Sequence, residues 1–439
     1  MRWLLFFFLL LLFDMLVPAQ AYAYLDPGTG NLLVYLVASI FGAGVYFLKD
    51  AFFFLKRKMG YDVGSRIQYS DKEGLIIFSE GKLYWTTFKP IIEALIDKGF
   101  HFRYYSMDIE DPALTIESPY MNSRYIGSGS AAFGRMAQIR GSLMLETTPN
   151  IGTPGYPMPA PRYIHCLAHV LHGIGDIGLY SKHAFDSCNT LITMNSQMEA
   201  SVRHVETMRG LPQKECIPLG VPCFDEISRQ VIRKKNISAP PVLLIAPSWG
   251  GKNCLAFYGT KFIAWLADAG YSIIIRPHPF SFSKEPGLIR ELEDIARQYE
   301  SVVIDTEVDS SKSLSSADVM ISDKSGVRFD FAFLYGKPVI TLDVPRASRD
   351  LFEISDLDYV WEDDVERLIG PVVKSSDLHS LTVETFDTLV KNALCVSSDS
   401  LLALGNEVVC NVGESGTLIA DWAIEKCLQL AVIEEKTAC

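Results

Sequence analysis

The stretch VLLIAPSWGGKNCLAFYGTKFIAWLADAGYSIIIRPHP, residues 242–279, decides the fold. It opens with an apolar run at residues 242–246 and ends with a second one at residues 272–275. The segment between them, residues 255–269, has helical periodicity. A strand, a helix and a second buried strand in this order predict two parallel strands joined by a crossover.

The same alternation continues beyond residue 279. Further strand-like runs and helical segments follow one another as far as residue 342, and together they predict one parallel, doubly wound sheet. The expected strands are residues 302–304, 319–321 and 339–342, and the expected helices are residues 286–299, 311–316 and 326–335.

A polar segment rich in chain-breaking residues, Arg233 to Pro241, predicts a linker to an earlier domain. Upstream of it the expected strands are residues 75–78, 101–105, 163–170, 191–193 and 217–219, and the expected helices are residues 84–98 and 196–208. Residues 112–162 are rich in Gly, Pro and Ser and do not resolve into elements. We therefore predict an α/β protein of two Rossmann-like doubly wound domains, residues 61–235 and 236–439, facing a cleft in a glycosyltransferase-B-like arrangement.

The composition excludes several classes of protein. Hydrophobic residues make up 49% of the 439 residues and charged residues 21%, which rules out disorder and a small disulfide scaffold. The net charge of −12 argues against general nucleic-acid binding. The nine cysteines are irregularly spaced and form no CxxC pair, as expected for reduced thiols in a cytoplasmic domain.

The amino-terminal residues 1–60 predict membrane attachment. Arg2 precedes an apolar run, and the small-residue site Ala21-Tyr22-Ala23 follows, in the order of a secretory signal peptide. A second apolar run, residues 32–55, is long enough to span a bilayer, and Lys56-Arg57-Lys58 follows it.

Cationic flanks stay on the cytoplasmic side, so residue 60 onward is expected in the cytoplasm, on the inner face of the cytoplasmic membrane. Cleavage after Ala23 would leave one spanning helix, whereas an uncleaved chain would form a two-helix hairpin. A buried core helix over residues 32–55 is the alternative.

Three of the eight histidines fall in one segment, His165 to His172. On a helix, His165, His169 and His172 would share a face and could bind a metal. The segment begins like a strand, however, and a strand carries only His165 and His169 on one face. His172 sits where the strand gives way to Gly173, a place where such folds carry catalytic side chains, and its imidazole could act as a general base.

Two more motifs follow strands in the carboxyl-terminal domain. Arg276-Pro277-His278-Pro279 ends one strand, and its guanidinium offers a planar fork of donors for phosphate oxygens. Residues 321–330 (ISDKSGVRFD) carry a strand end into a helix start, where free amides, Ser322 and Ser325 could bind an anion or a ribose. Plain helix capping explains any one of these residues but not the whole set.

In this order the motifs resemble the CDP-glycerol glycerophosphotransferase family, the teichoic-acid primases and polymerases. His172-Gly173 is similar to the family's His-Gly motif, residues 276–279 to its Arg-Pro-His-Pro motif, and residues 322–330 with Lys337-Pro338 to its nucleotide-side motif. Here His-Gly continues as Ile174-Gly175-Asp176, where the family often has Thr-Pro-Leu-Lys.

The resemblance implies a membrane-bound transferase that moves glycerol phosphate, or a related polyol phosphate, from a CDP-linked donor. It implies a polyprenyl-linked or glycan acceptor of the cell envelope, release of CMP, and no cofactor or metal. The implied catalytic residues are His172, Arg276 and His278, and the implied substrate-binding residues are Asp176, Ser322, Asp323, Ser325, Gly326 and Asp330. A nucleotide-sugar glycosyltransferase of envelope polysaccharide synthesis and a catalytically silent membrane-bound scaffold are the alternatives.

Overall fold

The computed structural model describes residues 74–233, 237–251, 253–307, 309–344, 360–378 and 380–438. The predicted signal-like and transmembrane segments, residues 1–60, lie outside the described residues. Within the described part of the chain, no helix combines the length and the apolar character needed to cross a bilayer.

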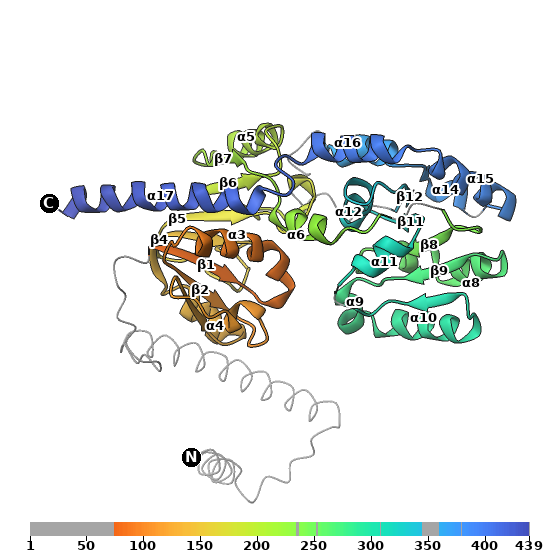
Figure 1. Ribbon diagram of the computed structural model, residues 1–439, viewed down its shortest axis with the longest axis horizontal. Coiled ribbons are helices and arrows are strands. Elements are labelled where there is room, and N and C mark those ends of the chain that lie inside the picture. Colours follow the sequence, from red (N-terminus) through yellow and green to blue (C-terminus); the bar gives the residue numbers. More distant parts are fainter. Residues whose placement is uncertain are drawn as a thin grey trace, which may run out of the picture. The chain divides into compact units, whose positions relative to one another are not determined.

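The first half of the described chain forms a seven-stranded sheet in which every pair is parallel (Figure 1). Its order is β3-β2-β1-β4-β5-β6-β7. The strands are β1 (Leu75–Ser79), β2 (Phe102–Ser106), β3 (Met121–Tyr125), β4 (Arg140–Glu146), β5 (Tyr163–Val170), β6 (Thr190–Thr193) and β7 (Glu215–Pro218). The connecting helices are η1 (Lys82–Tyr84), α3 (Trp85–Asp97), η2 (Pro112–Thr115), α4 (Gly129–Met136), η3 (Ile177–Leu179), α5 (Met198–Arg209) and α6 (Pro222–Gln230).

The second sheet has six parallel strands in the order β10-β9-β8-β11-β12-β13. They are β8 (Val242–Ile245), β9 (Ser272–Ile275), β10 (Val302–Ile304), β11 (Val319–Ser322), β12 (Val339–Leu342) and β13 (Val372–Val373). Its helices are α7 (Cys254–Tyr258), α8 (Lys261–Asp268), α9 (Pro279–Lys284), α10 (Pro286–Gln298), α11 (Ser311–Ser316), α12 (Val327–Phe333), α13 (Glu362–Leu368), α14 (Ser375–Leu378), α15 (Val383–Leu394) and α16 (Ser398–Val408).

The predicted fold of two parallel, doubly wound sheets is therefore confirmed. In both sheets the strand order reverses beside the first strand, between β1 and β4 and between β8 and β11. Such a reversal leaves a crevice at the carboxyl ends of the two strands, where ligands of these folds bind. The topology thus marks one ligand-binding edge in each sheet.

Several elements differ from the sequence expectation. The helix predicted over residues 255–269 is divided into α7 and α8 at Gly259, whose φ of 79° interrupts helical geometry. The region between residues 112 and 162 contains β3, α4 and β4, which carry too little periodicity to be seen. The strand β13 has only two residues, so it left no sequence signal.

The last helix, α17 (Ser415–Ala438), returns to the first sheet and packs on α3, α6 and β4 (Figure 1). The Asp225 carboxylate holds this return, because it accepts hydrogen bonds from the backbone N–H groups of Gly413 and Gly416 at 2.7 Å. The Ser415 hydroxyl donates to the Leu219 carbonyl at 2.6 Å. The carboxyl-terminal chain therefore ties both sheets into one compact unit over residues 70–439.

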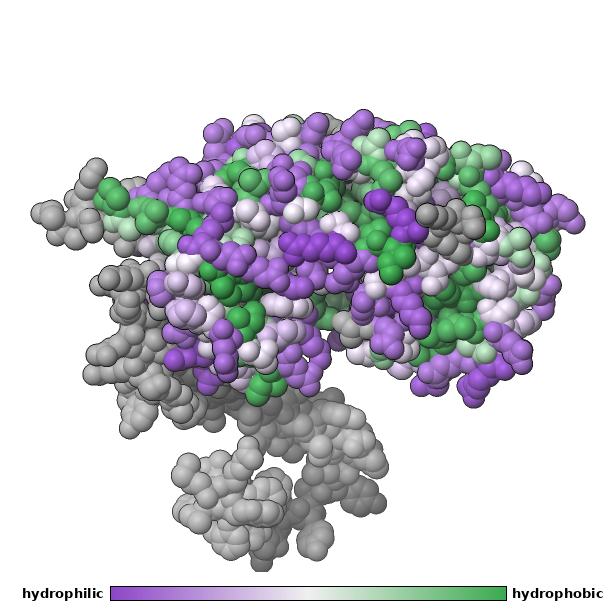
Figure 2. Space-filling model, viewed as in Figure 1, coloured by the Kyte–Doolittle hydropathy of each residue, from purple (hydrophilic) through white to green (hydrophobic). Residues whose placement is uncertain are grey.

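Apolar side chains fill both faces of each sheet, as the near-continuous apolar strands require. Residues of β1 such as Leu75, Ile76 and Phe78 are fully buried, and Leu243 and Ile245 of β8 are too. Hydrophilic residues cover most of the face seen in Figure 2, and hydrophobic residues form small groups among them.

Gly220 allows α17 to return, so we expect Gly220→Ala to destabilise the protein. The φ of Gly220 is 93°, and a Cβ there would overlap Ser415 Oγ and the Cys410 carbonyl oxygen. The loss should exceed about 1 kcal/mol in the free energy of unfolding, measured by urea denaturation. Gly287→Ala is the control, because Gly287 lies in α10 with nothing within 4 Å of a Cβ, and it should be neutral or stabilising.

Candidate active site

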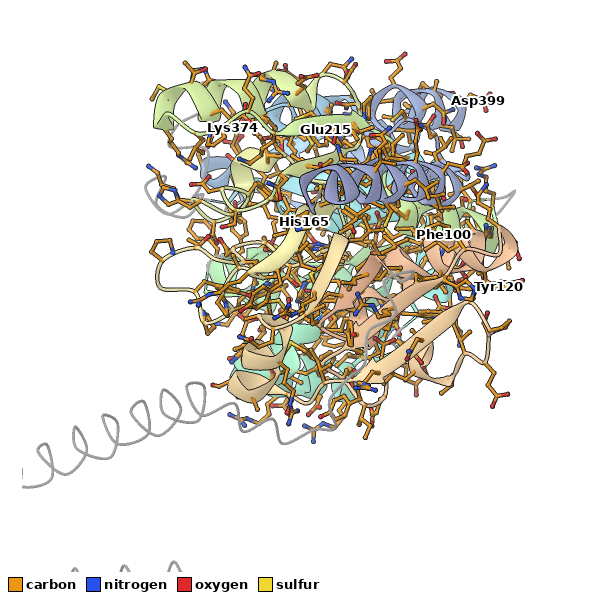
Figure 3. The ribbon with its side chains drawn as sticks, turned by 90° about the vertical axis from the view of Figure 1, so that its left-hand side faces the viewer. Phe100, Tyr120, His165, Glu215, Lys374 and Asp399 are labelled. Carbon is orange, nitrogen blue, oxygen red and sulfur yellow. The ribbon has the colours of Figure 1, made fainter. Side chains whose placement is uncertain are left out.

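The first half of the candidate site lies at the carboxyl ends of β1, β4 and β5. These strands are neighbours in the sheet, so Glu80 after β1, Glu146 at the end of β4 and His172 after β5 share one edge. His165 belongs to the opposite edge, at the start of β5, where it is exposed (Figure 3). Among the described residues, no group of three or more His, Cys, Asp or Glu side chains is placed to hold a metal ion.

The imidazole of His172 is packed between two tyrosine rings. The ring centroid of Tyr84 lies 5.3 Å away and that of Tyr180 6.4 Å away, both edge-on. Burial, and next the charge of His169, lower the pKa of His172 to about 4, whereas a backbone hydrogen bond with Thr147 opposes the change. His172 is therefore neutral at physiological pH and able to accept a proton.

His169 lies beside His172 and is buried. Its Nδ1 is 2.9 Å from Glu146 Oε1, and Glu146 Oε2 accepts a hydrogen bond from the Thr148 N–H at 2.6 Å. The side chains of His169 and Glu146 are 1% and 2% exposed, which makes this a buried pair. Sequence reasoning missed Glu80 and Glu146, although both stand where an apolar strand ends in a carboxylate.

The second half of the site lies at the carboxyl ends of β8, β9 and β11. Arg276 follows β9, and its Nη1 donates to Asp305 Oδ2 at 2.6 Å. His278 caps the N-terminus of α9, where its Nδ1 accepts a hydrogen bond from the Phe280 N–H at 3.2 Å. Burial lowers the pKa of His278, and the charges of Glu285 and Asp323 oppose this change.

The buried residues Ser322 and Asp323 shape the neighbouring loops. The Ser322 hydroxyl donates to the Ala246 carbonyl at 2.6 Å. The Asp323 carboxylate accepts hydrogen bonds from the N–H groups of Ser248 at 2.9 Å and Cys254 at 2.7 Å. Both side chains thus fix the loop that follows β8 against the end of β11.

That loop carries Trp249, which the sequence reading passed over. Its side chain is 49% exposed, and its ring centroid lies 6.1 Å from that of His278 and 5.2 Å from that of Phe280. The sequence signal for this residue was its position, because Trp249 comes directly after Pro247-Ser248 at the end of an apolar strand.

The two halves meet beside His172. A Cβ placed on Gly326, before α12, would lie 3.0 Å from the carbonyl oxygen of Ile174. Cys223 Sγ donates to the His172 carbonyl at 3.5 Å. Burial, and next the charge of Asp330, raise the pKa of the Cys223 thiol. Burial also raises the pKa of Asp330, to about 7. The loop after His172-Gly173 therefore touches the residue that precedes α12.

Asp176 connects the two halves through its backbone and its carboxylate. Asp176 Oδ2 accepts a hydrogen bond from the Trp361 N–H at 2.9 Å, and Oδ1 accepts one from the Gly178 N–H at 2.7 Å. The Asp176 N–H donates to Glu362 Oε1 at 2.9 Å. These contacts give Asp176 a positioning role at the junction.

Glu362 belongs to a buried ion cluster between α12 and α13. The fully buried Arg328 pairs with Glu362 and, at 3.1 Å, with Glu366. Lys324 also pairs with Glu366. A guanidinium with no solvent access must be compensated by such carboxylates, because an unpaired buried charge is costly.

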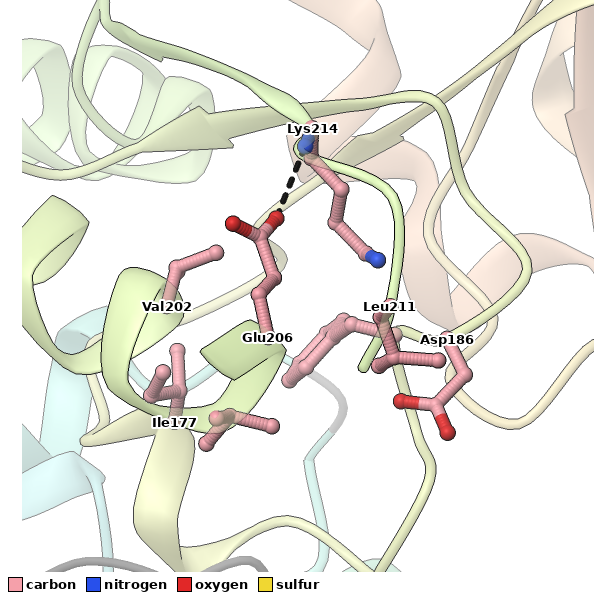
Figure 4. Close-up of a pocket in the computed structure, with 8 residues that line it drawn as sticks. Ile177, Asp186, Val202, Glu206, Leu211 and Lys214 are labelled. Carbon is pink, nitrogen blue, oxygen red and sulfur yellow. Dashed lines mark hydrogen bonds between the residues drawn. The ribbon is translucent and has the colours of Figure 1, made fainter. Parts of the chain in front are cut away.

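A pocket lies beside α5 and η3 (Figure 4). It is lined by Ile177, Phe185, Asp186, Val202, Val205, Glu206, Leu211 and Lys214. Glu206 Oε1 accepts a hydrogen bond from the Lys214 N–H at 2.7 Å, and this bond closes one side of the pocket. The lining thus combines apolar side chains with three charged residues, Asp186, Glu206 and Lys214.

Comparison with known sequences identifies a family domain in this chain. Residues 180–345 match the model of the family described as CDP-glycerol:poly(glycerophosphate) glycerophosphotransferase. This range contains Arg276, His278 and the motif at residues 322–330, whereas His172 precedes it. The match confirms the predicted resemblance and a CDP-glycerol glycerophosphotransferase-like transferase. No curated protein sequence matches the chain significantly.

Solved structures share the fold at low sequence identity. The wall teichoic acid polymerase TagF, in a variant soaked with CDPG, is 16% identical with a TM-score of 0.53, covering 89% of this chain and 98% of its own. The UDP-GlcNAc 2-epimerase of Methanocaldococcus jannaschii is also 16% identical, with a TM-score of 0.50, covering 80% of this chain and 99% of its own. These neighbours establish a glycosyltransferase-B-like fold.

Asp176→Ala should loosen the junction. It leaves the N–H groups of Trp361 and Gly178 without their carboxylate acceptor, so we expect a loss of about 1–3 kcal/mol in the free energy of unfolding. Urea denaturation measures this loss. Asp421→Ala is the matched control, because Asp421 pairs with Lys98 on an exposed face of α17, and its loss should stay below about 1 kcal/mol. Equal losses in the two variants would contradict the junction role.

Proposed function

We propose that this chain, whose residues 180–345 carry the glycerophosphotransferase domain, transfers glycerol phosphate from CDP-glycerol, or a related CDP-polyol, to a cell-envelope acceptor and releases CMP. One observation carries the proposal. The loop with the neutral His172 touches Gly326, which belongs to the nucleotide-side motif at residues 322–330 and directly precedes α12. An acceptor-activating base and a donor-binding motif thus meet at one place.

The donor side is built to hold a pyrophosphate. Arg276 is fixed by its bond to Asp305, so its planar guanidinium is already oriented when a phosphate arrives. His278 lies two residues further on and caps the N-terminus of α9. The Asp323-fixed loop brings Trp249 beside His278. In this proposal Arg276 and His278 bind the phosphates, and the segment from Ser322 to Asp330, with Ser325 and Gly326, binds the nucleotide side.

The acceptor hydroxyl is activated by His172. Its oxygen attacks the phosphorus next to the glycerol, a new O–P bond forms, and the bond from that phosphorus to the CMP oxygen breaks. The hydroxyl proton passes to the His172 imidazole, and CMP leaves with the bonding electrons. The transition state spreads negative charge over the phosphoryl oxygens, so positioning and electrostatic stabilisation supply most of the catalysis.

The amino-terminal sequence supports a membrane-attached enzyme with its catalytic part on the cytoplasmic face. The apolar run at residues 32–55 and the cationic residues 56–58 carry this part of the proposal. An acceptor attached to a polyprenyl lipid would then be presented at the same membrane surface.

The nucleotide that is released identifies the donor class. The purified full-length chain should release CMP from CDP-glycerol when a polyprenyl-linked glycan acceptor is present, detected by chromatography of the products. The same assay with UDP-sugars should release no UDP. Release of UDP would favour a nucleotide-sugar glycosyltransferase, and release of no nucleotide from any donor would favour a silent scaffold.

The two histidines should fail in different ways. His172→Ala removes the base and should lower kcat about 10²–10⁴-fold with little change in donor affinity. His278→Ala should raise the donor KM as well as lower kcat, because a pyrophosphate contact acts in both ground and transition states. Steady-state kinetics on folded variants separate the two. His204→Ala, at an exposed position of α5, is the control. Near-normal turnover of folded His172→Ala would overturn its role as base.

A further inference from the structure

Two carboxylates at the point where the strand order of the first sheet reverses have no role in the proposed phosphoryl transfer. Glu80 follows β1 and Glu146 ends β4, and these strands pair side by side in parallel. The crevice at such a reversal is where Rossmann-like sheets bind their ligands. In the second sheet the equivalent edge carries the donor motifs. The acceptor of the proposed reaction is therefore expected at the edge with Glu80 and Glu146.

The side chains at the carboxyl ends of β1 and β4 interact with one another. Glu80 is partly exposed and hydrogen-bonded to the Thr148 side chain, and the Thr148 N–H donates to Glu146 at 2.6 Å. Tyr84 and Tyr156 are partly exposed, and both interact electrostatically with Glu80 and Glu146. We call Glu80, Glu146, Tyr84 and Tyr156 the acceptor cluster. Its link to the proposed base is direct, because Tyr84 packs on His172.

Polar atoms without partners accompany the acceptor cluster. Thr147, between Glu146 and Thr148, is 2% exposed, and its hydroxyl has no hydrogen-bond partner among the described residues. The Nε2 of His169, whose Nδ1 bonds Glu146, also lacks one within the described part of the chain. Buried polar atoms of this kind are uncommon in folded proteins and indicate an absent ligand or water.

The charge of the acceptor cluster selects the chemistry of that ligand. Within the described residues, no lysine or arginine forms an ion pair with Glu80 or Glu146. Burial raises the pKa of Glu80, the hydrogen bond with the Thr148 side chain opposes this change, and the charge of Glu146 adds to it. A phosphate group would be repelled here, whereas ionised carboxylates accept hydrogen bonds from hydroxyl groups. Partly exposed tyrosine rings offer an apolar surface with a polar edge, which suits a sugar or polyol.

We propose that the acceptor cluster binds the acceptor through an uncharged, hydroxyl-rich end, and that the Glu80 carboxylate accepts a hydrogen bond from one of its hydroxyl groups. This inference rests on the proposed function and narrows it, because a neutral glycan end is selected over an end that already carries a phosphodiester. Glu80 is then a specificity-determining residue. The carboxylate of Glu146 holds His169 and Thr148 in place behind it.

Binding of two soluble probes to the full-length chain in detergent micelles tests this inference without the donor. The probes are an alkyl glycoside with free hydroxyls and the same glycoside carrying one glycerol phosphate, and calorimetry measures their affinities. The neutral glycoside should bind about tenfold more tightly. Equal or tighter binding of the phosphorylated probe, or binding of neither, would overturn the proposal.

Substitutions of Glu80 assign the selectivity to that residue. Glu80→Gln should weaken binding of the neutral glycoside about tenfold, because a hydrogen bond to a charged acceptor is lost, and Glu80→Lys should reverse the preference toward the phosphorylated probe. Glu117→Gln, at an exposed position before β3, should change neither affinity. Folded Glu80 variants with wild-type selectivity would overturn the proposal.

CDP-glycerol binding, measured in the same samples, distinguishes failure of the acceptor assignment from failure of the proposed function. Its absence would refute the proposed function, whereas the preference between the two glycosides would still be measured. Normal CDP-glycerol binding with the wrong glycoside preference would refute the acceptor assignment alone.

Discussion

The junction at Asp176 is the contact on which the candidate site depends. The Asp176 carboxylate accepts hydrogen bonds from the backbone N–H groups of Trp361 and Gly178. The backbone N–H of Asp176 donates to Glu362. Glu362 in turn neutralises the fully buried Arg328 of α12. Hydrogen bonds and ion pairs through Asp176, Glu362 and Arg328 therefore connect the loop after His172 with α12.

This construction explains why so many polar groups are buried near the site. Asp225 holds the returning chain before α17, and Asp323 holds the loop after β8, each through two backbone N–H groups. A buried carboxylate is tolerated when N–H groups satisfy it, and it then fixes loops that no apolar packing could position. His172 and His278, which are proposed to act on substrate, are adjacent to this framework.

Both sheets reverse their strand order beside their first strand, and the proposed function gives each reversal a different substrate. The reversal in the second sheet gathers Trp249, His278 and the Ser322 segment, whereas the reversal in the first gathers Glu80, Glu146 and His172. In the proposed reaction, donor phosphates contact the Arg276 guanidinium, and acceptor hydroxyls contact the Glu80 carboxylate and the neutral His172 imidazole.

The sequence by itself determined the parallel sheets, because buried parallel strands are short apolar runs and their crossovers have helical periodicity. It also singled out His172, Arg276 and His278, since each stands within three residues of the end of such a strand. It could not reveal that Asp176 contacts Trp361, 185 residues away, or that Glu80 and Glu146 are neighbours. These facts follow from strand order and from hydrogen bonds between distant segments, and only the tertiary structure decided them.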